Sequence, residues 1–146
     1  MADEIEILWA RSHSLSSLAI RAINWSAWSH CALVTPGGVI ESVWPAGVVV
    51  TVRERFEARS SRLASSSVAV PDARAALAFA RAQVGRPYDL AGALGLGLHR
   101  EWDDPSRWWC SELIAAALRA GGRTVFPRNQ HRVTPEHLWM ALGRSD

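Results

Sequence analysis

Two apolar segments, 28–35 and 39–44, separated by a proline–glycine pair at 36–37, constrain the fold more than any other feature. Short apolar runs on either side of such a pair predict two strands joined as a β-hairpin. A turn at 45–47 and a third apolar run at 48–52 follow directly. The sequence therefore predicts a three-stranded antiparallel meander.

The length of the turn at 36–37 decides which side chains share a face of this hairpin. In an even-length turn Ala32 faces Glu41 across the hairpin, and the pair His30 and Val43 comes next along the strands. All four then lie on one face, because successive side chains of a strand alternate between faces. His30 and Glu41 become diagonal neighbours, about 7–8 Å apart by backbone and within side-chain reach. An odd-length turn would move Glu41 to the opposite face.

Periodicity and capping signals predict the remaining elements. Alternation predicts an opening strand at 4–10, and helical spacing predicts a helix over 14–23. The segment 53–67 fits no regular pattern and is interpreted as an irregular crossing that can include a further strand at 67–70. Further helical segments are expected at 72–85, at 87–98, from 110 to the glycines at 121–122, and from 134 onward. We therefore expect an α+β fold, a small antiparallel sheet packed against helices, in a single domain over 1–146.

Composition narrows the functional class. The chain has 146 residues, 49% of them apolar and 21% charged, which is typical of a globular domain. A net charge of +2 with scattered arginines does not favour a nucleic-acid partner. No apolar run approaches the roughly 20 residues of a membrane helix, and the acidic start lacks the order of a signal peptide. The default expectation is a cytoplasmic protein, although delivery by phage lysis or by a secretion machine would leave no mark in the sequence.

Cys110 points most directly to chemistry, because it directly precedes an alanine-rich helical run. A thiol at a helix start faces unpaired N–H groups and the positive end of the helix dipole, which lower its pKa. A reactive thiolate also needs a base, and His30 is the best candidate, with Glu41 positioned to hold the imidazole and stabilise its cation. The backbone N–H of Cys110 is a candidate oxyanion donor.

Each of these residues has a plain structural alternative. Cys110 and His30 could be packed core residues, and Glu41 could be a solvated strand carboxylate. Cys31 is expected on the opposite face from His30, as core filler, and a structural disulfide with Cys110 is disfavoured in a cytosolic chain. The two cysteines have no histidines at zinc-site spacing, so no metal is expected. The eight tryptophans are read mainly as core residues, with an aromatic-walled groove as the alternative for some of them.

Taken together, the segments resemble the permuted branch of the NlpC-type papain-like superfamily, the YiiX-like proteins. Ordinary NlpC-type peptidases place cysteine before histidine, whereas here histidine comes first, as in the permuted branch and the related lecithin–retinol acyltransferase group. The resemblance runs over nearly the whole chain, and the order and spacing of its short motifs are more specific than any one motif. The matching segments are WSHCALV at 28–34, VIE at 39–41, GV at 47–48, GRPYD at 85–89, WCSEL at 109–113 and TP at 134–135.

This resemblance implies a papain-like fold and a cysteine hydrolase that cleaves amide or ester bonds through an acyl-thioester. By the same resemblance Cys110 is the nucleophile, His30 the base and Glu41 the third member of the triad. Tyr88 matches a tyrosine near the site that assists the oxyanion or binds substrate. The implied partners are cell-wall peptides or lipid-like acyl amides and esters, with no cofactor. Two alternatives stay open: an acyltransferase that uses the same site, and an inert papain-like scaffold used for binding.

Overall fold

The computed structural model describes residues 3–11, 28–88, 110–125 and 135–142. The helix predicted at 14–23 lies outside the described residues, as does nearly all of the helical stretch predicted at 87–98. Within the described part, no helix is long and apolar enough to span a bilayer.

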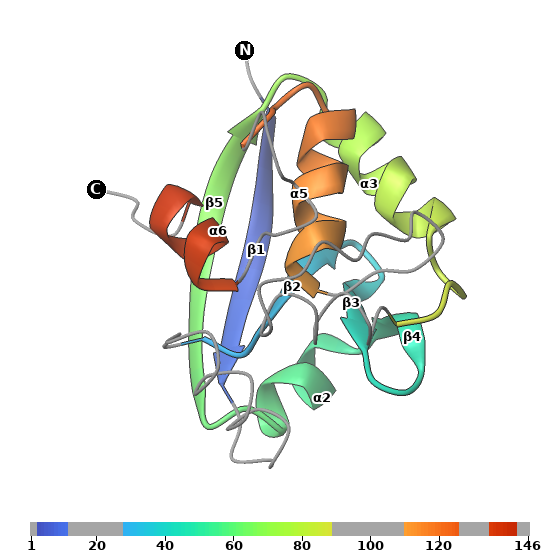
Figure 1. The fold of residues 1–146 in the computed structure, drawn as a ribbon, viewed down its shortest axis with the longest axis vertical. Coiled ribbons are helices and arrows are strands. Elements are labelled where there is room, and N and C mark those ends of the chain that lie inside the picture. The colour runs from blue at the N-terminus through green and yellow to red at the C-terminus, as the bar shows by residue number, and fades with distance from the viewer. Residues whose placement is uncertain (1–2, 12–27, 89–109, 126–134, 143–146) are drawn as a thin grey trace, which may run out of the picture.

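The centre of the fold is a five-stranded sheet in which every neighbouring pair is antiparallel (Figure 1). The strand order is β4-β3-β2-β1-β5, so the predicted meander forms one side of the sheet and the opening strand lies between β2 and the edge strand β5. Its strands are β1 (Asp3–Arg11), β2 (His30–Thr35), β3 (Gly38–Val43), β4 (Gly47–Thr51) and β5 (Arg62–Val70). The predicted α+β class is confirmed.

The β2–β3 hairpin has the register predicted for an even-length turn. Leu33 pairs with Ile40, and Thr35 pairs with Gly38, so only 36–37 lie in the loop. Gly38 has a φ of 135°, and a Cβ at this position would lie 2.5 Å from the carbonyl oxygen of Thr51. Glycine is therefore required where the hairpin passes close to β4.

Four helices are described: α2 (Arg53–Ala58), α3 (Ala73–Ala82), α5 (Cys110–Ala120) and α6 (Pro135–Leu142). The start of α3 is capped as predicted, because the Asp72 carboxylate accepts a hydrogen bond of 2.9 Å from the Ala75 N–H. The starts predicted for α5 and α6 are also confirmed. α6 opens with proline at its first position, where the missing N–H removes no intrahelical hydrogen bond.

The interpretation of 53–67 as an irregular crossing was wrong. This segment forms helix α2 and the first part of β5, which begins at Arg62 rather than at 67. Three consecutive serines in β5 hide the strand from a reading based on apolar alternation. One of them, Ser66, is buried and accepts a hydrogen bond of 2.8 Å from the indole N–H of Trp9. α2 has only six residues, too few to show a helical period.

Apolar side chains pack on both faces of the sheet. The larger cluster lies between the sheet and helices α3, α5 and α6, and it joins β2 and β3 residues such as Cys31 and Ile40 to Cys110 and Leu113. Figure 1 shows α3 and α5 side by side along this face. The smaller cluster lies on the other face, where Phe56 of α2 is fully buried. The two faces therefore carry different helices.

Candidate active site

The candidate residues come together because they stand at the ends of their elements. His30 is the first residue of β2 and Cys110 is the first residue of α5. Strand alternation puts His30 on the α2 face of the sheet, whereas Cys31 and Cys110 belong to the cluster on the α5 face. The imidazole is nevertheless near enough to the Cys110 thiol for each group to shift the pKa of the other. The site therefore joins groups from both faces of the sheet.

His30 and Glu41 are in direct contact, as the hairpin register predicts. The Nε2 atom of His30 donates to Oε1 of Glu41 at 3.0 Å. The Glu41 side chain is fully buried, and that of His30 is 19% exposed. A buried carboxylate is stable only when it is paired, so this contact fixes the ring orientation as well as the charge.

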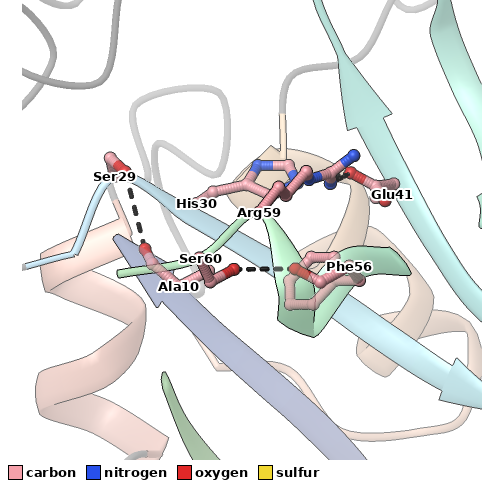
Figure 2. Close-up of polar contacts among 7 residues, drawn as sticks. All are labelled: Ala10, Ser29, His30, Glu41, Phe56, Arg59 and Ser60. Atoms are coloured by element: carbon pink, nitrogen blue, oxygen red, sulfur yellow. Dashed lines mark hydrogen bonds and ion pairs between the residues drawn. The ribbon is translucent and has the colours of Figure 1, made fainter. Parts of the chain in front are cut away.

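Helix α2 and the residue that follows it supply two further contacts to this pair (Figure 2). The Arg59 guanidinium forms an ion pair with Oε1 of Glu41, the same oxygen that His30 contacts. The Phe56 ring lies near both cations, with its centroid 5.8 Å from that of His30 and 5.1 Å from the Arg59 guanidinium carbon. Sequence reasoning missed both residues, because it assigned no structure to their segment. The segment 53–59, which is α2 and the residue after it, has no sequence pattern that indicates a contact with β3.

The ionisation of Glu41 follows from these contacts. Burial by itself raises the pKa of the carboxyl group, but the hydrogen bond from His30, the imidazolium charge, a hydrogen bond from Thr51 and the Arg59 charge together lower it to about 2. Glu41 is therefore an anion throughout the physiological range.

His30 is shifted in the opposite direction. Burial lowers the pKa of the imidazole, but its hydrogen bonds and charge interactions with Cys110 and Glu41 outweigh burial and raise the pKa to about 9. Since the unperturbed value is about 6.5, the ring that is ordinarily neutral at pH 7 is held here as the cation.

The Cys110 thiol is surrounded by groups that favour its ionised form. A hydrogen bond from the Cys31 side chain, then the hydrogen bond and charge of His30, and finally the Cys31 backbone N–H lower its pKa well below the ordinary range, although burial opposes the shift. Burial and the neighbouring Cys110 sulfur raise the pKa of Cys31. At neutral pH the arrangement is a thiolate on Cys110, an imidazolium on His30 and a neutral thiol on Cys31.

Cys31 therefore has a contact that sequence reasoning did not assign. It lies on the opposite face from His30 and is fully buried, as predicted, yet it also touches the Cys110 sulfur. Both cysteines are free thiols. Over the described ranges, no group of three or more His, Cys, Asp and Glu side chains is arranged to hold a metal ion.

Tyr88 lies beside β4, at the end of a segment that packs closely on that strand. The Val48 N–H donates to the Arg86 carbonyl at 2.9 Å, and a Cβ on Gly47 would lie 2.2 Å from the same oxygen. The buried Tyr88 ring stands edge-on to Trp44, with 6.3 Å between ring centroids. Its place in the site stays a prediction.

The described tryptophans fall into two groups. Trp9 and Trp28 are buried, and each packs on Trp139 with ring centroids 5.2 and 5.1 Å away, respectively, so the interpretation as core residues is confirmed for them. Trp44 is 60% exposed. The remaining four, at 25, 102, 108 and 109, lie outside the described residues.

Comparisons with known proteins bear on the fold. No protein-family model matches the chain, and no curated protein matches it by sequence. Among solved structures, the chain is similar to the metalloprotein yiiX from Escherichia coli O157:H7 (DUF1105), with 18% identity and a TM-score of 0.61. The match covers 85% of this chain and 69% of that one. At this identity the likeness is one of fold, and the observed α+β architecture is consistent with a YiiX-like, papain-like fold.

Proposed function

We propose that this protein is a cysteine hydrolase of amide or ester bonds that works through an acyl-thioester on Cys110. One observation carries the proposal: a continuous line of contacts runs from the Cys110 thiol through His30 to the buried Glu41 carboxylate. Nucleophile, base and orienting carboxylate are the three parts that an activated thiol requires.

The reaction starts from the thiolate–imidazolium pair. The Cys110 sulfur attacks the substrate carbonyl carbon. The Cys110 backbone N–H, which has no intrahelical acceptor at the first position of α5, donates to the oxyanion. His30 gives its proton to the departing amine or alcohol, leaving an acyl-thioester. The neutral imidazole then takes a proton from water, the hydroxide attacks the thioester, and the acid leaves as the thiolate and imidazolium are restored.

The substrate is an acyl amide or ester, either a cell-wall peptide or a lipid-like acyl group. The yiiX protein is described as a metalloprotein. In the described ranges of this chain, no set of residues fits a metal ion, and no step of the proposal is assigned to one.

A direct test is to trap the thioester with 4-nitrophenyl acetate. We expect nitrophenol release and transient acetylation of the protein, located at Cys110 by peptide mass spectrometry after acid quench. Acetylation only at residues other than Cys110, or none at all, would contradict the proposal. Adding butylamine separates the two forms of the reaction: mainly acetate indicates a hydrolase, and mainly N-butylacetamide indicates an acyltransferase.

Arg59 is proposed as a positioning residue that acts through Glu41. In Arg59→Ala, Glu41 loses one of its two cationic partners, and His30 loses a nearby positive charge that opposes its protonation. We expect kcat for the acetate ester to fall about 10-fold with little change in KM, and the alkaline limb of the pH–rate profile to move upward.

The matched control is Arg55→Ala, which removes the same charge from an exposed position of α2, the helix that Arg59 directly follows. Arg59→Lys keeps a cation and should fall between Arg59→Ala and the unmodified protein. An unchanged alkaline limb in Arg59→Ala would show that Arg59 does not act through the Glu41–His30 pair.

A further inference from the structure

Cys31 is a buried sulfur that the proposed mechanism does not use. It lies on β2, in the middle of the sheet, and its side chain belongs to the same apolar cluster as Cys110 and Leu113 of α5. Its side chain and its backbone N–H are near enough to the Cys110 sulfur to lower the pKa of that thiol. A core residue that served only to fill space would need neither contact.

The two cysteines belong to elements that pack against each other, Cys31 to β2 and Cys110 to α5. β2 is hydrogen-bonded on both sides, to β1 and to β3, and α5 packs against it. A disulfide requires Cβ atoms roughly 3.5–4.5 Å apart and sulfurs that can reach about 2.05 Å. Cys31 and Cys110 are both buried in one cluster, on a strand and a helix that pack together, which places them as candidates for such a bond.

We propose that Cys31 and Cys110 form an oxidation site, in which a hydroperoxide converts the dithiol to an intramolecular disulfide that switches the active site off. The Cys110 thiolate attacks the peroxide, breaking its O–O bond. The sulfur becomes a sulfenic acid, and the peroxide is reduced to water or an alcohol after proton uptake. The Cys31 sulfur then attacks Cys110, water leaves, and the disulfide forms. A dithiol reductant reverses the change.

The surroundings of the two sulfurs determine which one is oxidised first and which one then attacks it. Cys110 carries the thiolate and makes up the nucleophilic centre, so it reacts first. Cys31 is 0% exposed and stays a thiol, which shields it from direct oxidation but leaves it in contact with the sulfenic acid. Capture by Cys31 also protects Cys110 from further oxidation to the irreversible sulfinic and sulfonic acids.

Only the loss of activity on oxidation rests on the proposed function. Disulfide formation itself is measured by mass spectrometry and does not depend on it. The folded protein is treated with hydrogen peroxide, quenched with N-ethylmaleimide under denaturing conditions, and analysed by intact and peptide mass spectrometry. We expect both free thiols to disappear together, a peptide joining Cys31 to Cys110, and recovery of both thiols with dithiothreitol. On a non-reducing gel the protein should remain a monomer.

Cys31→Ser provides the decisive comparison, with Cys31→Ala as a second variant and thermal unfolding as the check on folding. Without the second sulfur, Cys110 should advance to the sulfinic acid, and after reduction the recovery of free Cys110 should be about 10-fold lower than in the unmodified protein. Sulfinic acid on Cys110 with Cys31 still open to N-ethylmaleimide in the unmodified protein would overturn the proposal. An intermolecular disulfide would also overturn it.

A parallel measurement separates this proposal from the proposed function. Acetylation of reduced protein by 4-nitrophenyl acetate reports on the hydrolase proposal alone. A disulfide without acetylation would leave the oxidation site standing and remove the hydrolase. Acetylation without a disulfide would do the reverse.

Discussion

Replacing Cys110 by serine is expected to lower kcat/KM for 4-nitrophenyl acetate by at least about 10³-fold, because removing the nucleophile of such a triad costs about this much or more. The serine hydroxyl has nearly the same shape, but an alcohol ionises far less readily than a thiol, so it stays protonated and is a much weaker nucleophile at neutral pH. The trapped acetyl group should disappear as well. Nitrophenol release at limiting ester gives kcat/KM, and peptide mass spectrometry after acid quench reports the trapped acetyl group.

Ala120→Ser is the matched control, because it puts the same side chain at the other, exposed end of α5. It should leave the rate unchanged. Thermal unfolding distinguishes lost chemistry from lost structure, since Cys110 is also part of the core. Equal rates in Cys110→Ser and the unmodified protein would leave the inert binding scaffold as the better interpretation.

The part of the site that could be predicted is the part determined by local geometry. The turn at 36–37 fixes the hairpin register, and the register alone brings His30 and Glu41 together, because side chains on one face recur with a period of two. Likewise, the alanine-rich run and its glycines place Cys110 at the start of a helix. Both predictions rest on periods that are readable within about ten residues.

The parts that could not be predicted depend on which elements lie across the sheet. No local pattern says that α5 covers the face of Cys31 rather than the face of His30, so the contact between the two sulfurs was not foreseen. Arg59 shows a second limit. It directly follows α2, a helix of six residues that is held by contacts distant in sequence, among them the Arg53–Glu6 ion pair at 2.9 Å. Such a helix takes its stability from tertiary contacts rather than from its own sequence.

The second large effect expected is on the pH dependence of Cys110 alkylation by iodoacetamide, read at the Cys110 peptide by mass spectrometry. In the folded protein the pKa of the thiol is lowered and that of His30 is raised to about 9, so the thiolate–imidazolium pair exists between the two values. Labelling should therefore persist below about pH 7, where an ordinary thiol with a pKa of about 8.5 is almost wholly protonated.

His30→Ala removes the imidazolium and its hydrogen bond, so the pKa of Cys110 should move back toward the ordinary range. At about pH 6 a thiol with a pKa of about 8.5 is well under 1% ionised, and labelling should slow by about 100-fold. His137→Ala, on an exposed position of α6, is the control and should label like the unmodified protein. Identical pH profiles with and without His30 would mean that the imidazole does not activate the thiol.

The ionisation of Cys110 and His30 also determines how kcat/KM should change with pH. The rate constant kcat/KM should rise with pH as Cys110 loses its proton. It should fall again as pH passes about 9, where His30 loses the proton that it must give to the leaving group. Because the two groups interact, both limbs belong to the pair rather than to either residue. A single rising limb near pH 8.5, as for an isolated thiol, would contradict the ion pair and, with it, the proposed division of roles between Cys110 and His30.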